Sequence, residues 1–370
     1  MSEILFLPQG DFIRQLLLGG SISDYRIIQL LRSKGVFLDN TDRNYSIPLL
    51  MKTIVSAEDY HYLLEKQKSR EDKVKYRTAS IKCDSDFSLL DVVGGSDLDI
   101  NKFINDSSPY QQMFKVKGSP SFYLENPDTA VLDYELEREN VLSNFNSKQT
   151  IHNGKIILKK TDDNGIQLVL QQNITAKETH TVNELVIKSL KKKLHDHKLI
   201  RQDSDFARIK FSDFSNKNRI HFLLSFINIA CVYLKFLSIS DVDLYLDTKV
   251  ETHKDLKKFL HEIENLKLSG VALQDHVILK TPAYYPKLIL SMIKLKHDLD
   301  YKGLKGRCDL TLSFPEYISK TKDLSSELQI TLDVQLDTEF RSYKNQKVIS
   351  KDIFNILERI KITQFNRFKT

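Results

Sequence analysis

LQITLDVQL, residues 328–336, is the stretch that decides the fold class of this chain. Its apolar and polar positions alternate without a break, with Leu328, Ile330, Leu332, Val334 and Leu336 set against Gln329, Thr331, Asp333 and Gln335. Such a period of two places one face of a strand on a core and the other in water, which antiparallel sheets allow. We therefore expect an antiparallel sheet in the last hundred residues.

Further segments with strand and helix patterns surround this one. The expected strands are 155–160 and 166–172, joined as a hairpin through Asn164-Gly165, and 241–249, 277–279, 287–296 and 308–314. The expected helices are one opened by a capping box at Thr181–Glu184, a long apolar one at 215–237, an amphipathic one at 252–267 and a closing one at 350–360. Helices segregated from antiparallel strands predict an α+β architecture.

The chain has 370 residues, which favours two or three domains. Residues 1–70 read as a small helical module, in which a helix is expected over 9–18 and another begins with Ser56 as its N-cap and Asp59 at its third position. The almost entirely polar stretch 65–76 is our candidate linker. Residues 71–150 form a mixed region with short segments between turn signals. Residues 151–370 are the expected α+β domain, which ends in a basic helix.

Composition excludes several classes of protein. Cys83, Cys231 and Cys308 are far apart and form no CxxC pair, so neither a zinc ribbon nor a disulfide framework is indicated, and a reducing cytoplasm fits best. The apolar run 222–237 is shorter than the roughly 20 residues of a membrane span, and the N-terminus lacks the features of a secretory signal. Neither a Gly-rich phosphate loop nor a GxSxG elbow is present, so an ATPase or acyl-transfer enzyme is disfavoured.

Positive charge is unevenly distributed in a chain of formal charge +6. One concentration lies at 188–201 and another at 341–369, where aromatic and basic residues interleave. Phosphates can be bound by Lys and Arg while aromatic rings stack on bases. The alternative is that these lysines only keep apolar helices soluble.

The sharpest catalytic candidate is a row of carboxylates. Asp241, Asp243 and Asp247 share one face of an expected strand, and clustered oxygen ligands can hold Mg²⁺. A metal site needs carboxylates that converge from different elements, and the sequence offers no matching partner. The polar side of any half-exposed strand has the same pattern, so we expect no metal site and no cofactor.

The N-terminal module carries the pattern most typical of nucleic-acid binding. SDYRIIQLLRSKGVFLDNTDRNYSIPLLMKTIVS, residues 23–56, predicts a helix over 24–34 that Gly35 ends, a loop, and a second helix over 45–53. This helix–loop–helix resembles a SAP-type DNA-binding module. It departs from that family in the loop, where Asp39, Asp42 and Arg43 replace a Gly-Lys pair.

The chain also resembles the non-nuclease subunit of the two-gene, GAPS-type anti-phage systems of bacteria. The resemblance lies in residues 7–72, in "LPQGDFIRQLLLGGSISDYRIIQLLRSKGVFL" followed by "SIPLLMKTIVSAEDYHYLLEKQKSRED". It implies a partner that is a separate PD-(D/E)xK nuclease, a hetero-oligomeric complex, and a role for this chain in recognising invading DNA.

Three hypotheses follow from these patterns. The first is a DNA-binding and partner-binding subunit with no chemistry of its own. Its expected DNA contacts are Arg32, Lys34, Arg43 and Lys52 in the N-terminal module, Lys191, Lys192 and Lys193, and Arg341, Tyr343, Lys344 and Lys347. The second is a divergent metal-dependent nuclease that uses the Asp241/Asp243/Asp247 face. The third is a scaffold whose N-terminal helices bind protein rather than DNA.

Overall fold

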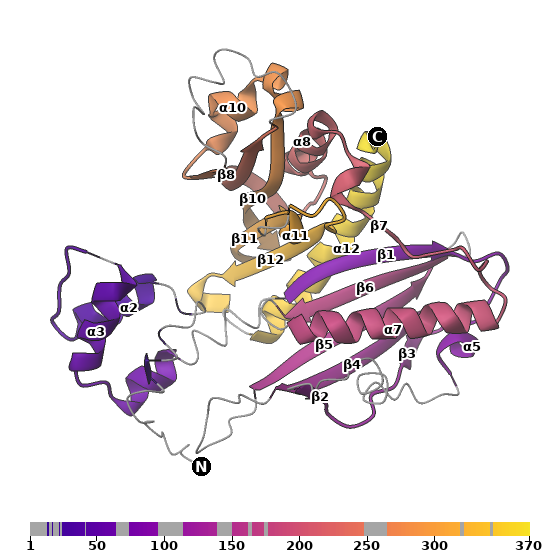
Figure 1. Cartoon of the computed structure of the whole chain (residues 1–370), viewed down its shortest axis with the longest axis horizontal. Coiled ribbons are helices and arrows are strands. Elements are labelled where there is room, and N and C mark those ends of the chain that lie inside the picture. Colours follow the sequence, from indigo (N-terminus) through magenta and orange to yellow (C-terminus); the bar gives the residue numbers. More distant parts are fainter. Residues whose placement is uncertain are drawn as a thin grey trace. The chain divides into compact units, whose positions relative to one another are not determined.

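The chain forms two compact units in the computed structural model (Figure 1). Unit 1 comprises Met1–Lys73 with Asn173–Ala176, and unit 2 comprises Val74–Gln172 with Lys177–Thr370. The structure describes residues 13–14, 17, 22, 24–40, 42–63, 74–94, 114–138, 150–161, 165–173, 177–247, 265–318, 322–340 and 343–370.

Unit 1 is helical, as its sequence predicts. It contains α2 (Asp24–Ser33), α3 (Arg43–Lys52) and a further helix over 57–63, which pack around Ile27, Leu31, Ile47, Leu50 and Leu63. Gly35 follows α2 with φ of +78°, a conformation that glycine adopts without steric cost. Of the helix expected near the N-terminus, only residues 13, 14 and 17 are described, and they are helical.

Local capping fixes where the helices of unit 1 begin. Asp42 accepts a hydrogen bond from the backbone N–H of Asn44 (2.8 Å), so α3 begins two residues before the predicted Tyr45. The predicted cap at Ser56 and Asp59 is confirmed as a reciprocal capping box. The Ser56 N–H donates to Asp59 Oδ2 (2.9 Å), and the Asp59 N–H donates to Ser56 Oγ (3.1 Å).

The described residues of unit 2 form one sheet of twelve strands with helices packed on it, so the predicted α+β class with an antiparallel sheet is confirmed. The sheet follows the order β2-β4-β5-β6-β1-β12-β11-β10-β8-β9, while β3 pairs with β4 and β7 with β1. The strands are β1 (Val74–Lys82), β2 (Phe114–Val116), β3 (Tyr123–Asn126), β4 (Thr129–Arg138), β5 (Thr150–Lys160), β6 (Gly165–Asn173), β7 (Ala207–Arg208), β8 (Leu234–Leu246), β9 (Asn265–Ser269), β10 (Leu288–Tyr301), β11 (Leu304–Ser313) and β12 (Gln329–Leu336).

The stretch at 328–336 forms β12, whose neighbours are β11 and β1. The predicted strands at 155–160, 166–172, 287–296 and 308–314 lie within or largely within β5, β6, β10 and β11. Residues 71–150, which have no clear pattern, contribute β1–β4 and the short helix α5 (Leu89–Val93). β1 joins the two halves of the sheet because it pairs with β12, with Tyr76 opposite Ile330.

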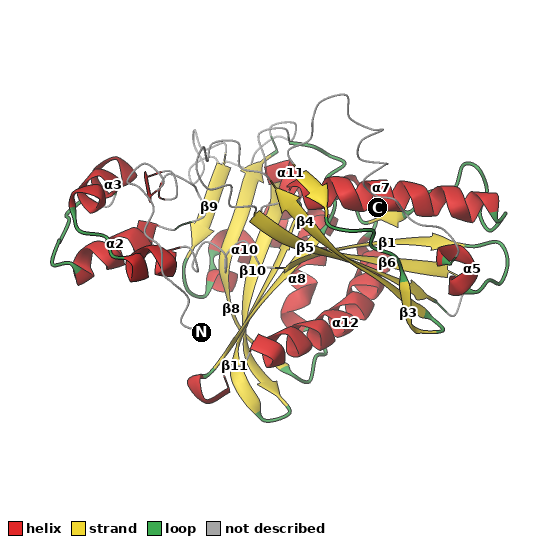
Figure 2. Ribbon diagram, turned by 90° about the horizontal axis from the view of Figure 1, so that it is seen from below, coloured by secondary structure: helices red, strands yellow, loops and turns green. Residues whose placement is uncertain are grey.

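Helices cover both faces of the part of the sheet formed by β4, β5 and β6. α7 (Lys177–Asp196) lies on one side and α12 (Tyr343–Phe368) on the other (Figure 2). The other helices that the structure describes in unit 2 are α8 (Asn216–Leu224), α10 (Val277–Lys280), α11 (Pro315–Ile318), and the 3₁₀ turns η1 (Phe211–Asp213), η2 (Ser225–Asn228), η3 (Leu273–Asp275), η4 (Pro282–Lys287) and η5 (Thr338–Phe340).

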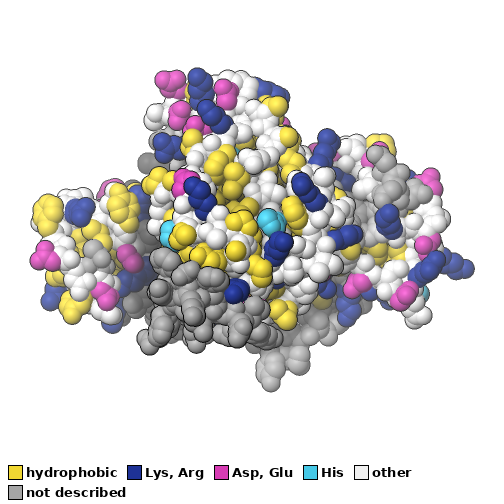
Figure 3. Space-filling model, turned by 90° about the horizontal axis from the view of Figure 1, so that it is seen from above, with side chains coloured by type: hydrophobic (Ala, Val, Ile, Leu, Met, Phe, Trp, Pro, Cys, Tyr) yellow, Lys and Arg dark blue, Asp and Glu magenta, His cyan; other side chains and the backbone are white. Residues whose placement is uncertain are grey.

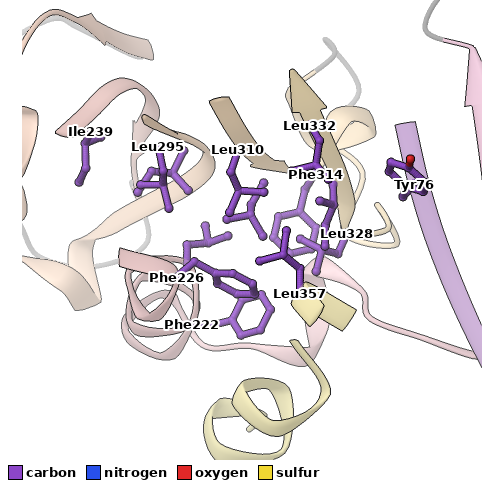
Figure 4. Packing of buried hydrophobic residues seen from close by; sticks show 14 of the residues in the cluster. Tyr76, Phe222, Phe226, Ile239, Leu295, Leu310, Phe314, Leu328, Leu332 and Leu357 are labelled. Atoms are coloured by element: carbon purple, nitrogen blue, oxygen red, sulfur yellow. The ribbon is translucent and has the colours of Figure 1, made fainter. Parts of the chain in front are cut away.

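The larger hydrophobic core of unit 2 lies between the sheet and the helices α8 and α12. In Figure 4, Phe222, Phe226 and Leu357 from this helical side lie close to Leu310 and Phe314.

Four predictions about single elements fail or fall outside the described residues. The long helix expected at 215–237 is wrong, because α8 and η2 end at Asn228 and β8 begins at Leu234. A continuous apolar run fits a buried helix and a strand buried on both faces equally well. Residues 277–279 form the helix α10 rather than a strand, and α7 begins at Lys177, before the predicted cap at Thr181. Most of the helix expected at 252–267 lies outside the described residues, and its last three positions belong to β9.

Candidate nucleic-acid interface

Two of the four candidate cations in unit 1 are bound within the unit. Lys34 Nζ donates to Asp59 Oδ2 and to the carbonyl oxygen of Ile54, both at 2.6 Å. Arg43 Nε lies 2.5 Å from Asp24 Oδ1, and its terminal nitrogens donate to the carbonyl oxygens of Leu17 and Ile22. The contact between Arg43 and Asp24 holds the first turns of α2 and α3 together. The contact between Lys34 and Ile54 holds together the residues that follow the two helices.

The other two candidates, Arg32 and Lys52, are presented to solvent. Each lies in the last turn of its helix, and both are exposed. Among the described residues, neither has a carboxylate or another polar partner within bonding distance. Because Lys34 ties the residues after α2 to Ile54 after α3, Arg32 and Lys52 lie at the same end of the helix pair.

Unit 1 also exposes large apolar side chains. Phe37 is 78% exposed and Ile54 is 90% exposed, and Tyr25 and Tyr45 are each more than half exposed. Phe37 follows the last turn of α2, and Ile54 follows that of α3. Isolated apolar residues are common on surfaces, and these four are divided between the two ends of the helices, with Tyr25 and Tyr45 in the first turns and Phe37 and Ile54 after the last turns.

The three candidate lysines of α7 occupy different environments. Lys191 Nζ lies 3.2 Å from Asp205 Oδ1, and Lys192 is exposed. Lys193 Nζ is buried with no hydrogen-bond partner, and this burial lowers the pKa of its ammonium group. Of the three, only Lys192 is therefore presented to a ligand without a competing contact. Lys188, which our prediction of site residues omits, is also exposed on α7.

The described cations of the basic C-terminal segment are exposed on α12 or directly after it, with the exception of Lys361. Arg341 and the side chains of Tyr343 and Lys344 lie outside the described residues, while Lys347 is exposed on α12. Lys361 is 4% exposed and is bound to Glu358. The rings expected to interleave with the cations also pack inward, since Phe365 contacts Phe214 and Phe368 stacks on His221.

The carboxylates at 241–247 do not act as one cluster. Asp241 accepts hydrogen bonds from Ser240 Oγ (2.9 Å) and Ser269 Oγ (2.7 Å), and Asp247 accepts one from Asn216 Nδ2 (2.7 Å). Asp243 is buried and 3.8 Å from Lys267 Nζ. Within the described parts of the chain, no group of three or more His, Cys, Asp or Glu residues is arranged to hold a metal ion.

The sheet instead brings together charged residues that the sequence does not connect. Lys294 Nζ in β10 lies 2.9 Å from Asp309 Oδ2 in β11 and 4.0 Å from Asp241 Oδ2 in β8. Asp309 is directly opposite Asp333 in β12. Carboxylates opposite each other repel, and the ammonium group of Lys294 offsets this repulsion. Its pKa is raised by these carboxylates despite partial burial. The ammonium group of Lys294 therefore occupies the place between Asp241 and Asp309 that a metal ion would need.

Asp243 is the least compensated acid of this face. It is 1% exposed and its Oδ1 has no hydrogen-bond partner, so burial raises the pKa of its carboxyl group above the ordinary value of 3.8. A raised folded-state pKa means that the folded protein binds this proton more tightly than the unfolded chain does. The stability of the folded state therefore falls as the pH rises from about 4.

We expect Asp243→Asn to raise the melting temperature at neutral pH, because the amide has nearly the same shape and carries no buried charge. The gain is expected to shrink as the pH falls toward 4, and thermal unfolding followed by circular dichroism across this range measures it. Asp241→Asn is the control, and it is expected to lose stability because Asp241 has two hydroxyl donors and a nearby lysine. An Asp243→Asn variant that is less stable than wild type at neutral pH would contradict the account.

Side-chain chemistry on the surface does not by itself single out a binding face. In Figure 3, Lys and Arg side chains are interspersed with Asp and Glu on the visible face. The useful distinction is between cations that are paired within the protein, such as Lys34, Arg43 and Lys191, and exposed cations that have no such partner. None of the helices in the described part of the chain combines the length and the apolarity needed to cross a membrane.

Comparison with protein families gives a match for the N-terminal unit. Residues 11–73 match the family model described as the GAPS4b protein N-terminal domain. No curated protein matches the chain. The match covers most of unit 1, including α2, α3 and helix 57–63, and it supports the resemblance to GAPS-type defence proteins.

Proposed function

We propose that this chain is a DNA-binding and partner-binding subunit of a bacterial anti-phage defence complex that acts with a separate nuclease subunit. The match of residues 11–73 to the GAPS4b protein N-terminal domain supports the assignment to a defence system. The observation that carries DNA binding is the pair Arg32 and Lys52, two exposed cations without internal partners at one end of α2 and α3. The resemblance of residues 7–72 to the non-nuclease subunit of GAPS-type systems supports the separate nuclease subunit.

In this proposal the two helices position cations on the phosphate backbone of a duplex. The unpaired charges of Arg32 and Lys52 displace counterions from DNA, which makes binding depend on salt. Lys34 and Arg43 act indirectly, because their charges are neutralised within unit 1 and their contacts hold the helix ends in place. The two pairs of cations therefore have separable effects.

We expect Arg32→Gln/Lys52→Gln to weaken DNA binding and to lower the melting temperature only slightly, because each cation lies in the last turn of its helix and interacts with the helix dipole. The slope of log K against log salt is expected to fall in magnitude by about 1.8, which is 0.9 for each lost phosphate contact. Titration of the purified full chain with labelled duplex DNA at several salt concentrations measures this change.

The matched control is Lys34→Gln/Arg43→Gln, which removes the same charge. We expect this variant to lower the stability of unit 1, because Asp24, Asp59 and three carbonyl oxygens lose their donors. Wild-type protein that fails to bind DNA, or binding that does not change with salt, would refute the proposed function.

The same assay addresses the two alternatives. Cleavage of the duplex by the purified chain with Mg²⁺ would favour a nuclease, and its loss in Asp243→Ala would locate the activity. A scaffold role predicts that Arg32→Gln/Lys52→Gln keeps phage defence intact while Phe37→Asp/Ile54→Asp abolishes assembly with the nuclease. Co-purification with that subunit measures the assembly.

A further inference from the structure

α7 is a rigid helix with one stripe buried and the opposite stripe exposed. Val182, Val186, Leu190 and Leu194 recur every fourth residue and are all buried in the core beneath the helix. The helix is fixed further by Tyr134 in β4, whose hydroxyl donates to Asn183 Oδ1 (2.8 Å). Side chains on the opposite stripe therefore project from a helix that is anchored along its buried face.

Two lysines occupy this exposed stripe one turn apart. Lys188 and Lys192 are separated by about 6 Å along the helix axis, at 1.5 Å per residue, and both are exposed. Lys198 follows two residues after the end of α7, where a positive φ of +57° and a hydrogen bond from its N–H to His195 O (2.8 Å) fix the turn. The three cations form what we call the α7 ridge.

Two acids near this ridge, Glu184 and Asp205, are already engaged, while Asp196, one turn after Lys192, is exposed and lies 3.8 Å from His195 Nδ1. Glu184 lies one turn before Lys188, the position of a helical ion pair. It instead receives both terminal nitrogens of Arg208 at 3.1 Å. Asp205 pairs with Lys191. Across the described residues, Lys188, Lys192 and Lys198 have no bonded partner.

We propose that the α7 ridge is a second DNA-contacting surface, which binds the phosphate backbone of a duplex through Lys188, Lys192 and Lys198. This inference rests on the proposed function and adds a site in unit 2 to the one in unit 1. Protein interfaces are centred on buried aromatic, Met or Arg anchors, whereas this stripe carries lysines and no large exposed apolar side chain. A row of unpaired ammonium groups fits a polyanion with regularly spaced charges.

The alternative explanation for these three lysines is that cations near the C-terminus of a helix interact favourably with the helix dipole and so stabilise α7. That role predicts lower stability when the ridge is neutralised. Lys188 and Lys192, however, are like charges one turn apart and repel each other. A ridge that serves DNA therefore predicts that neutralisation leaves the melting temperature unchanged or raises it.

The test is a titration of the full chain carrying Lys188→Gln/Lys192→Gln/Lys198→Gln with labelled linear duplex DNA over a range of salt concentrations. We expect the slope of log K against log salt to fall in magnitude by about 2.7, for three lost phosphate contacts. The control is Lys191→Gln, which changes the neighbouring residue. We expect it to leave the slope nearly unchanged, because Asp205 already neutralises Lys191.

Each outcome is decisive. A reduced slope with an unchanged or higher melting temperature supports the ridge. A wild-type slope in the triple variant, together with a reduced slope in Arg32→Gln/Lys52→Gln, would reject the ridge and leave the proposed function standing. A wild-type chain that does not bind DNA rejects both. A triple variant that melts earlier and keeps its affinity would assign the lysines to the helix dipole.

Discussion

Lys361→Met is expected to lower the free energy of unfolding of unit 2 by about 3–5 kcal/mol, the usual loss when one partner of a buried ion pair is removed. Lys361 Nζ donates to both carboxylate oxygens of Glu358, at 2.7 and 2.8 Å, and to Thr78 Oγ1 in β1. Both charged residues are almost fully buried. The variant leaves the Glu358 carboxylate in the interior without its cation.

The ion pair of Glu358 and Lys361 also lies where α12 packs against β1 and β6. Gln167 in β6 donates to Glu358 (3.3 Å), and the ring of Tyr76 in β1 stacks on Phe354 with centroids 3.9 Å apart. Loss of Lys361 therefore weakens the attachment of the helix to β1 and β6 together. Urea unfolding followed by circular dichroism measures the change, since the chain contains no tryptophan.

The control for this experiment is the double variant Glu358→Leu/Lys361→Met. Replacing a buried ion pair by apolar residues of similar volume is often nearly neutral, so we expect the double variant to regain more than half of the lost stability. A loss in Lys361→Met of less than about 1 kcal/mol, typical of surface pairs, would show that water reaches Glu358.

Gly154→Val is expected to destabilise unit 2 by about 3 kcal/mol or more, through overpacking and a lost hydrogen bond. Gly154 in β5 is directly opposite Tyr134 in β4, and any Cβ atom at position 154 would overlap the tyrosine ring. The ring is buried and its hydroxyl is bonded to Asn183 and to Thr179 O in α7. A ring displaced by valine pulls away from α7.

Asn153→Val provides the matched control, because it adds the same side chain one residue earlier on the exposed face of β5. We expect a change within about 0.5 kcal/mol there. In a Tyr134→Ala background the penalty of Gly154→Val is expected to disappear, which a double-mutant cycle detects. Equal stability of the Asn153→Val and Gly154→Val variants would contradict the predicted overlap.

Residues close together in the sequence were enough to predict several elements. The alternation at 328–336 identifies β12, and the Ser56 and Asp59 spacing identifies a capping box whose two hydrogen bonds the structure contains. These features depend on positions two or three residues apart. The fold class followed because it needs only the kinds of elements present.

The candidate site was less predictable, because the state of a cation depends on distant partners. Lys34 and Arg32 look alike in the sequence, yet Lys34 is paired with Asp59 and Arg32 is not. Likewise, Lys191 and Lys192 are neighbours in the chain, and only the first meets Asp205. A count of Lys and Arg residues in the sequence cannot show which of them are neutralised by an acid elsewhere in the fold.

Local periodicity and contiguous motifs encode the antiparallel strand pattern, the helical N-terminal unit and its likeness to a defence-protein domain, so these features could be predicted from the chain without its fold. Other features depend on long-range packing: the division of 215–237 between α8 and β8, the position of Asp309 opposite Asp333 beside Lys294, and which lysines are exposed without a partner. Strand register and ion pairing join residues tens to hundreds of positions apart. No local pattern specifies such pairs, and the packing of the whole sheet selects them.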